Sequence, residues 1–396
     1  MRSYIFIILL FSTLFLGCES FLSEVPDDRT ELKDVESIKA LLVSAYPEGH
    51  YMLQGEWMSD NADDKGTWQV SVYPQMQEEA YKWEENTTND YDSPTKYWDA
   101  CYRAIAAANH ALEAIDNLGN TPELQPYRGE ALVARAYAHF MLVNFWGKHY
   151  NPATMASDLG VAYVEKPEKE ALVIYTRNTV KEVYEQILKD LDASAKLFEK
   201  YNVVIGNYRM NLPAVKILLS RVYLYMEEWQ NAVNAANDAI ELGRGLTDLT
   251  LVDENVNYCM NSYDVNETVC IFGARIDNYS MAYVVSSDLL KLFNSKDRRI
   301  GIYIIAQYSG GGDFTGWLIN KNAAAGEPGQ CLRLAEAYLN RAEAYSRLTG
   351  KQSDALADLN TLRKHRIMDY RDVSIADPTA LLDTIRKERR LELAFE

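Results

Sequence analysis

The residues of this sequence best suited to contact a ligand are tryptophans and tyrosines in stretches without a helical repeat. A flat ring offers an apolar face, and tyrosine and tryptophan each add one polar group. Long irregular segments on a rigid scaffold often carry binding function. The candidates are Trp68, Tyr73 and Trp83 in a first stretch and Tyr279, Tyr283, Tyr308 and Trp317 in a last one. Burial within the loop and contact with a partner protein are the alternatives for each ring. The weaker polar candidates are Asn86, Asn278 and Asn320.

Patterns typical of catalysis and metal binding are weak in this sequence. YSGGGDFTGW at 308–317 lacks the Gly-Lys-Ser/Thr ending of a phosphate loop, so we interpret it as a flexible loop tip. DNADDKG at 60–66 resembles a calcium loop, but Ala62 occupies a ligand position, so we expect a solvated loop. The histidines show no HExxH spacing, and G-x-S-x-G does not occur. We therefore predict no metal, no cofactor and no catalytic residue, although a glycosidase's carboxylate pair has no recognisable spacing.

The N-terminus has the order of an export signal. A basic start precedes an apolar run at 4–16, which is shorter than the roughly 20 residues that a membrane-spanning helix needs. Gly17 before Cys18 resembles the lipobox of bacterial lipoproteins, although Phe15 and Leu16 depart from its usual residues. We expect cleavage before Cys18 and its acylation, with an ordinary signal peptide as the alternative. Each buried methylene contributes about 0.8 kcal/mol, so two or three acyl chains anchor a folded domain.

Charge and cysteine content exclude several classes of protein. The formal net charge of −17 argues against nucleic acid as a partner and against electrostatic binding to anionic lipid. No CxxC spacing indicates zinc or redox chemistry. The cysteines after Cys18 are Cys101, Cys259, Cys270 and Cys331. Cys259 and Cys270 are close enough in sequence to pair, but we favour buried thiols.

Helical signals dominate the chain after residue 34. Start signals lie at Asp34, at Ser93 before Pro94, at Thr121 before Pro122, and at Thr179 with Glu182. Further helices are expected over 211–226, 229–242, 331–348 and 353–366. Three stretches, 65–92, 151–176 and 245–330, show no helical period, and 267–275 and 300–308 are candidate strands.

A repeat of a small residue three positions before a tyrosine occurs at Tyr137, Tyr223 and Tyr345. Around the second copy, the residues at tetratricopeptide positions are Leu219, Ser220, Tyr223, Ala232 and Ala239. The three tyrosines are too far apart for a plain array, so we expect an array interrupted by insertions. We expect these tyrosines, together with Trp98, to lie in the core.

Ten stretches in this order give the chain a resemblance to the SusD/RagB family, the surface lipoproteins of Bacteroidota nutrient-uptake systems. They are GCESFLSEVPDD, SDNADD, YWDACYRAIAAANHAL, RGEALVARAYAHFMLVNFWG, TVKEVYEQILKDL, LLSRVYLYMEEWQNAVNAANDAI, SSDLLKLFNSKDRR, CLRLAEAYLNRAEAY, DALADLNTLRKHR and IRKERRLELAFE. The resemblance implies a cell-surface, outer-membrane protein that binds oligosaccharides or, less often, peptides. It also implies a TonB-dependent, SusC-like transporter as partner and no catalytic role. Sugars in such proteins commonly stack on aromatic rings.

The predicted fold class is mostly α, with tetratricopeptide-like helix pairs as a scaffold and irregular insertions that carry a few short strands. The predicted domains are a signal peptide at 1–17, a tether at 18–33 and one SusD-like domain at 34–396, with insertions at about 65–92, 151–176 and 245–330. Members of the family continue beyond ELAFE, so we expect Glu396 to lie inside a helix and the C-terminus to be truncated. The alternatives to glycan capture are peptide capture, a tetratricopeptide adaptor and a glycan-degrading enzyme.

Overall fold

The structure is a computed structural model, which describes residues 32–49, 51–64, 74–89, 93–170, 172–201, 206–253, 260, 262, 265–272, 283–321 and 330–396. These residues are mostly helical, as predicted. The α-helices are α3 (Val35–Leu42), α4 (Met52–Trp57), α5 (Pro74–Tyr81), α6 (Pro94–Asn117), α7 (Gln125–Trp146), α8 (Val180–Tyr201), α9 (Leu212–Tyr225), α10 (Trp229–Leu242), α11 (Ser287–Leu290), α12 (Arg299–Ile302), α13 (Leu334–Arg347), α14 (Gln352–Lys364) and α15 (Pro378–Leu393). The strands are β1 (Ala62–Asp64), β2 (Thr268–Phe272), β3 (Tyr283–Val285), β4 (Ile304–Tyr308), β5 (Phe314–Ile319) and β6 (Gln330–Arg333).

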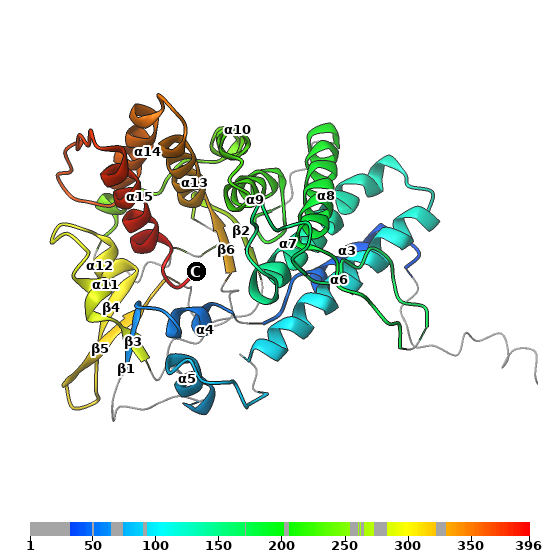
Figure 1. Ribbon diagram of the computed structural model, residues 1–396, viewed down its shortest axis with the longest axis horizontal. Helices are drawn as coiled ribbons and strands as arrows, with labels where there is room; N and C mark the ends of the chain where they lie inside the picture. Colours follow the sequence, from blue (N-terminus) through cyan, green and yellow to red (C-terminus); the bar gives the residue numbers. More distant parts are fainter. Residues whose placement is uncertain are drawn as a thin grey trace, which may run out of the picture.

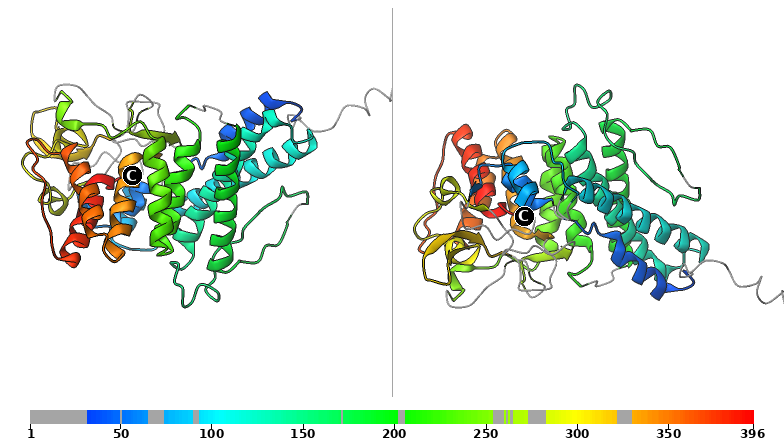
Figure 2. Two further views of the ribbon diagram at one scale, coloured as in Figure 1. Left: turned by 90° about the horizontal axis from the view of Figure 1, so that it is seen from above. Right: turned by 90° about the horizontal axis from the view of Figure 1, so that it is seen from below.

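The long helices form an arc across the top of the molecule in Figure 1, from α6 at one end to α15 at the other. From α6 to α10, and then through α13 and α14 to α15, each helix packs against the next. The strand pairs and the short helices α4, α5, α11 and α12 lie below the arc (Figure 1). Two further views show the same succession of helices along the long axis (Figure 2). No helix among the described residues has both the length and the apolar composition to cross a membrane.

Local capping explains why most helix starts were predictable. The Asp34 side chain accepts from the Ser37 amide, and the Thr179 amide donates to Glu182 while the Glu182 amide donates to Thr179. The Ser93 side chain caps α6 ahead of a proline at the first helical position. The helix expected after Thr121 begins as a 3-10 turn, Pro122–Leu124, that leads into α7.

Several local expectations are wrong. Residues 331–333 belong to strand β6, because they pair with β2 before α13 begins at Leu334. The first irregular stretch contains α5, a helix too short to show a clear period. Residues 308–317 are not a simple flexible tip but the turn and flanks of the β4–β5 hairpin. Helix α15 ends at Leu393, since Phe395 adopts a left-handed φ of 65°, so Glu396 does not lie inside a helix.

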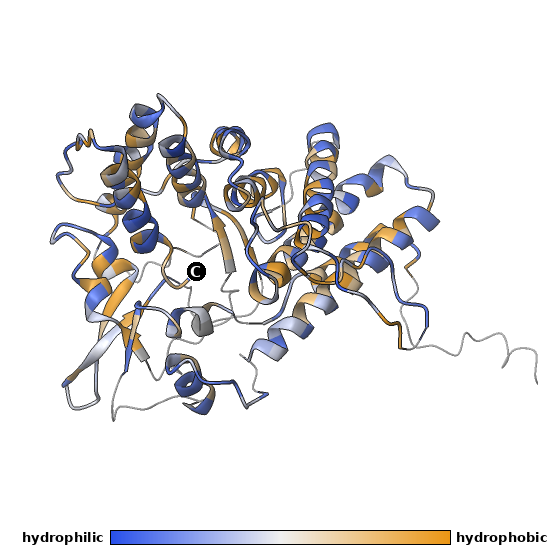
Figure 3. Cartoon of the chain, in the orientation of Figure 1, coloured by the Kyte–Doolittle hydropathy of each residue, from blue (hydrophilic) through white to orange (hydrophobic). Residues whose placement is uncertain are grey.

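Small residues let the helices approach closely, as the repeat indicated. Ser220, Ala232 and Ala239 are fully buried, and the Asn340 amide of α13 donates to the Ser220 hydroxyl over 2.8 Å. Tyr137 is buried, whereas Tyr223, Tyr345 and Trp98 are only partly buried against apolar clusters. Strands β4 and β5 are largely hydrophobic and orange in Figure 3, whereas β1 is blue.

The strands form three separate antiparallel pairs, β1 with β3, β2 with β6 and β4 with β5. The two stretches expected to contain strands, 267–275 and 300–308, do contain β2 and β4. The stretch 60–64 is not a solvated loop, because residues 62–64 pair with β3. Its polar groups are used by the fold, since Asp63 accepts from the Ser287 amide and Asn61 accepts from Arg390. Asn61 and Asp63 therefore have roles in the fold itself.

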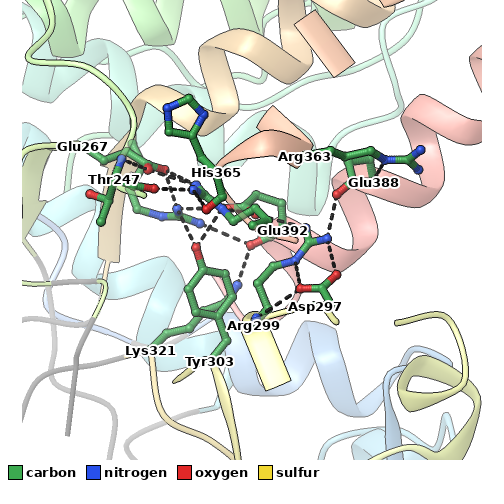
Figure 4. Close-up of polar contacts among 12 residues, drawn as sticks. Thr247, Glu267, Asp297, Arg299, Tyr303, Lys321, Arg363, His365, Glu388 and Glu392 are labelled. Carbon is green, nitrogen blue, oxygen red and sulfur yellow. Dashed lines mark hydrogen bonds and ion pairs between the residues drawn. The ribbon is translucent and has the colours of Figure 1, made fainter. Parts of the chain in front are cut away.

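A buried network of ion pairs joins the C-terminal helix α15 to α12, to β6 and to the segment that follows α14 (Figure 4). Glu392 on α15 lies at its centre and is fully buried. It accepts hydrogen bonds from Arg299, Arg333, Arg366 and Tyr303 at 2.9–3.1 Å. Burial alone would raise the pKa of Glu392, but Arg366, Arg333 and Arg299 outweigh it and hold that pKa well below its usual range. The carboxylate therefore stays charged.

Candidate functional site

The structure brings the ends of the first and last irregular stretches together through the β1–β3 strand pair. In the β1–β3 pair, Asp64 lies opposite Tyr283, so the chain leaves β1 and enters β3 at the same end of this pair. Strand β3 also packs against β5 of the hairpin. In Figure 1 the free end of β1, helix α5 and the tip of the β4–β5 hairpin all lie along the lower edge of the molecule. Two segments with candidate aromatics, the residues that follow α5 and the β4–β5 hairpin, therefore lie along this edge.

Gly316 permits the close packing of β5 on β3. Its φ is 145°, and a Cβ atom added there would lie 2.5 Å from the Val284 side chain. We predict that Gly316→Ala lowers the free energy of unfolding by about 1–3 kcal/mol, because the new methyl group pushes the strands apart and the backbone becomes strained. Urea denaturation followed by circular dichroism measures this change. Gly311→Ala in the open hairpin turn is the control, since a Cβ there meets no atom closer than 3.6 Å. Equal stability of both variants would contradict the prediction.

Three aromatic rings form a row along the hairpin. Tyr308 and Phe314 are paired residues with ring centroids 5.9 Å apart, and Phe314 lies 5.9 Å from Trp317. Tyr308 is 62% exposed and Phe314 is 53% exposed, whereas Trp317 is half-buried. The row therefore begins at the core and runs outward to solvent. These two exposed rings leave apolar surface in contact with water, which is unfavourable. A ligand or partner that covers the rings would remove this cost.

Trp317 also lines a cavity of about 540 Å³, here called the hairpin pocket. Its apolar wall includes Phe293 and Ile300, and its polar wall is formed by residues 294–298 with Asp369. Within the described part of the chain, the Ser295 side chain has no hydrogen-bond partner, and the Asn294 side-chain oxygen accepts only from the Lys296 amide. Aromatic faces beside uncommitted polar groups match the chemistry of a sugar, whose C–H face is apolar and whose rim carries hydroxyls.

The base of the hairpin is held by the buried ion network. Tyr303 directly precedes β4, and its hydroxyl donates to Glu392 over 2.9 Å. Lys321 follows β5, and its Nζ atom donates to the backbone oxygens of Glu392 and Ala394 over 2.6 and 2.7 Å. Figure 4 shows Tyr303 and Lys321 side by side beneath the network. Helix α15 thus fixes both ends of the hairpin that presents the aromatic row.

Trp83 lies apart from this row, after α5. Its ring is 71% exposed, and its φ of 57° is unusual for a residue with a side chain. The following segment carries a buried Asn86 amide nitrogen and a buried Thr88 hydroxyl that lack partners among the described residues. An exposed tryptophan on strained backbone, beside unpaired polar atoms, is a second exposed aromatic feature on this side of the molecule.

The structure places some of the predicted site residues, and others lie outside the described residues. Tyr308 and Trp317 lie in one row, and Trp83 is exposed elsewhere. Trp68, Tyr73, Tyr279 and Asn278 lie outside the described residues, as does Cys18, and Tyr283 is placed only by its backbone in β3. Asn320 is not a free polar contact, because it closes the hairpin base by bonding to the backbone oxygens of Ile302 and Tyr303.

Sequence analysis missed Phe314 and Phe293. The signal for Phe314 was its position across a glycine-rich turn from Tyr308, which is the pattern of a hairpin. Among the described residues, no cluster of histidine, cysteine and acidic side chains could hold a metal ion. Cys101, Cys270 and Cys331 are free thiols, and Cys259 lies outside the described residues.

Two protein-family models and several solved structures match this chain. Residues 20–224 match the SusD-like_3 family, described as starch-binding associating with outer membrane, and residues 275–396 match SusD_RagB, the SusD family. A SusD superfamily protein from Bacteroides thetaiotaomicron VPI-5482 has a TM-score of 0.75 at 23% identity, with 93% of this chain and 87% of the other covered. A comparison with curated proteins finds no match.

Two other solved structures have the same fold. A SusD-like carbohydrate binding protein from Bacteroides vulgatus ATCC 8482 has a TM-score of 0.70 at 19% identity, with 92% of this chain and 82% of the other covered. A laminarin binding SusD-like protein has a TM-score of 0.66 at 20% identity, with 92% and 89% covered.

Proposed function

The chain belongs to the SusD/RagB family, and on that premise we propose that it is a glycan-binding protein of the outer membrane whose ligand stacks on the hairpin aromatics. The observation that carries the proposal is the row of Tyr308, Phe314 and Trp317 beside the hairpin pocket. Carbohydrate binding in solved proteins of the same fold supports it. The site binds by equilibrium capture on a surface that is largely formed before the ligand arrives.

The rest of the proposal concerns how the captured glycan reaches the cell. Acylation at Cys18 anchors the protein at the cell surface, and a TonB-dependent, SusC-like transporter receives the glycan from it. The protein is non-catalytic in this proposal. The family description as associating with the outer membrane supports the location.

The test is affinity electrophoresis of the mature chain through gels that each contain one polysaccharide, including laminarin and starch. We expect at least one neutral glycan to slow the protein. The Trp317→Ala variant is expected to lose the retardation, because truncation of an aromatic anchor lowers affinity by about tenfold or more. Tyr225→Ala removes a ring that is also half-exposed, on α9, and is the matched control. If no glycan slows the protein, or if Trp317→Ala migrates like the unchanged chain, the proposal fails.

A further inference from the structure

A second cavity lies at the opposite end of the molecule from the hairpin. Its volume is about 850 Å³, and it lies between α6 and the loop at 160–177. Helix α6 contributes Trp98, Tyr102 and Arg103, and the loop contributes Lys166, Tyr175 and Arg177. We call it the α6 pocket. It shares no residue with the hairpin pocket.

The loop that forms its outer wall is fixed at its base. The Tyr102 hydroxyl donates to the Ala162 oxygen over 3.1 Å, and burial raises the pKa of Tyr102 to about 12, so this donor stays protonated. The Asn109 amide donates to the Val164 oxygen over 2.9 Å, and the Val164 amide donates to His139 Nε2 over 3.0 Å. Arg177 Nε donates to the Gly160 oxygen over 2.6 Å where the loop returns. The pocket is therefore held open by hydrogen bonds at both ends of the loop.

The inner wall presents aromatic faces. The Trp98 ring lies 5.0 Å from Tyr102 and 5.1 Å from Trp146, measured between ring centroids. Trp98 is anchored by these contacts but remains partly exposed, which is why its assignment to the core was incomplete. Tyr175 is 43% exposed on the loop side. Rings on two sides of a cavity suit a flat, partly apolar ring such as a pyranose.

Two basic residues of the α6 pocket lack the acidic partners that other lysines in this region have among the described residues. Nearby lysines are neutralised by carboxylates: Lys148 by Asp158, Lys169 by Glu113 and Lys189 by Glu165. By contrast, Arg103 and Lys166 are exposed and form no ion pair or hydrogen bond with any residue that the structure describes. They come from different walls of the same cavity.

The other charged groups of the α6 pocket do not cancel the positive charges of Arg103 and Lys166. Among the described residues, Arg177 donates only to backbone oxygens, those of Gly160, Trp146 and Leu159. On the acidic side, Glu168 lies beside Tyr175 on the loop, and Asp99 is exposed. The pocket thus holds three basic and two acidic side chains in a chain whose net charge is −17. A ligand that carries a negative charge matches this arrangement.

We propose that the α6 pocket is a second glycan-binding site, which takes an acidic sugar unit whose carboxylate or sulfate pairs with Arg103 and Lys166 while its ring stacks on Trp98 and Tyr102. The site is independent of the hairpin row. It gives the protein a preference for acidic glycans that the hairpin alone does not provide.

The test is isothermal titration calorimetry, in which each of three oligosaccharides is titrated into the mature chain. Oligogalacturonide carries carboxylates, its fully methyl-esterified form has the same backbone without charge, and a chondroitin sulfate oligosaccharide of equal length carries sulfate as well. We expect one or both acidic probes to bind and the esterified probe to bind at least about tenfold more weakly. If only the chondroitin probe binds, sulfate is the recognised group; if oligogalacturonide binds, a carboxylate suffices.

Charge reversal then locates the site. Arg103→Glu and Lys166→Glu each lie at an exposed position and are expected to fold, while weakening the acidic probe by about tenfold or more. Lys387→Glu, an exposed reversal on α15, is the matched control and is expected to bind normally. Trp317→Ala is also expected to retain the acidic probe, so failure here and failure of the hairpin site are separable. The proposal is overturned if neither acidic probe binds, or if binding survives in the Arg103→Glu, Lys166→Glu double variant.

Discussion

Replacement of Glu392 with glutamine is expected to lower the free energy of unfolding by about 3–5 kcal/mol. Glutamine has nearly the same shape, but it removes the negative charge that Arg299, Arg333 and Arg366 share. All three guanidinium groups are essentially inaccessible to solvent, so they keep their charge without water to compensate for the loss. Breaking one partner of a buried pair costs more than the pair contributes, because an uncompensated charge stays behind.

Urea denaturation of the mature chain, followed by circular dichroism, measures this effect. Asp383→Asn makes the same chemical change on the exposed face of α15 and is expected to shift stability by less than about 0.5 kcal/mol. The hairpin should loosen as well, because the single amide oxygen of glutamine must serve Tyr303 and the arginines that two carboxylate oxygens serve in the unchanged chain. Faster amide hydrogen exchange in β4 and β5 would report this. Equal stability of the Glu392→Gln and Asp383→Asn variants would mean that the network does not hold this half of the fold.

Low pH is expected to destabilise the fold around helix α7, because His139 is buried there as a neutral ring. This ring is completely buried on α7, where Nε2 accepts from the Val164 amide and Nδ1 donates to the Arg135 oxygen. Burial lowers its pKa from 6.5 to about 3, with a smaller contribution from the neighbouring Arg135 charge. The unfolded chain takes up a proton below pH 6.5 while the folded chain does not, so folding stability falls as pH falls from 6.5 toward 3. At pH 4 the loss is about 3 kcal/mol relative to pH 7.

The measurement is a series of urea denaturation curves at pH 7, 6, 5 and 4. His139→Gln keeps a side chain that can accept from Val164 but does not titrate. Its stability is expected to be lower at pH 7 and to fall less steeply toward pH 4. His149→Gln, at an exposed histidine, is the control for the substitution itself. The same steepness in the His139→Gln and unchanged proteins would contradict the assignment of a buried neutral histidine.

These two regions show how a helical repeat supports the two proposed binding sites. His139 and its neighbours fix the loop at 160–177, and Glu392 and its partners fix the β4–β5 hairpin. Each uses polar side chains from helices to hold the backbone of an irregular segment. Because the backbone is fixed in advance, little of the binding free energy is lost in ordering it.

Helix positions were predictable because their signals are local. Asp34, Ser93 and the pair Thr179 and Glu182 cap helices as expected, since a cap depends only on residues within one turn. Residues 331–333 show the limit of this reasoning. Their sequence continues smoothly into α13, but pairing with β2 makes them a strand, and no local pattern encodes a partner about 60 residues away.

The proposed binding site could be predicted by residue type but not by geometry. Trp317 and Tyr308 were candidates because they lie in an irregular stretch. Their association with Phe314 depends on strand register, and the hairpin pocket depends on residues of α11, α12 and the turn at 369 that meet only in the fold. The network around Glu392 was invisible for the same reason: in sequence, its arginines look like ordinary charges at the ends of helices.

The central claim is that the hairpin aromatics bind glycan, and one titration tests it most directly. The polysaccharide that slows the protein most is cut to an oligosaccharide and titrated calorimetrically into the unchanged chain, Trp317→Ala and Tyr225→Ala, after circular dichroism has verified that all three are folded. We predict saturable binding to the unchanged chain and to Tyr225→Ala, and affinity at least about tenfold weaker for Trp317→Ala. Equal affinity of all three proteins would place the glycan elsewhere and contradict the account.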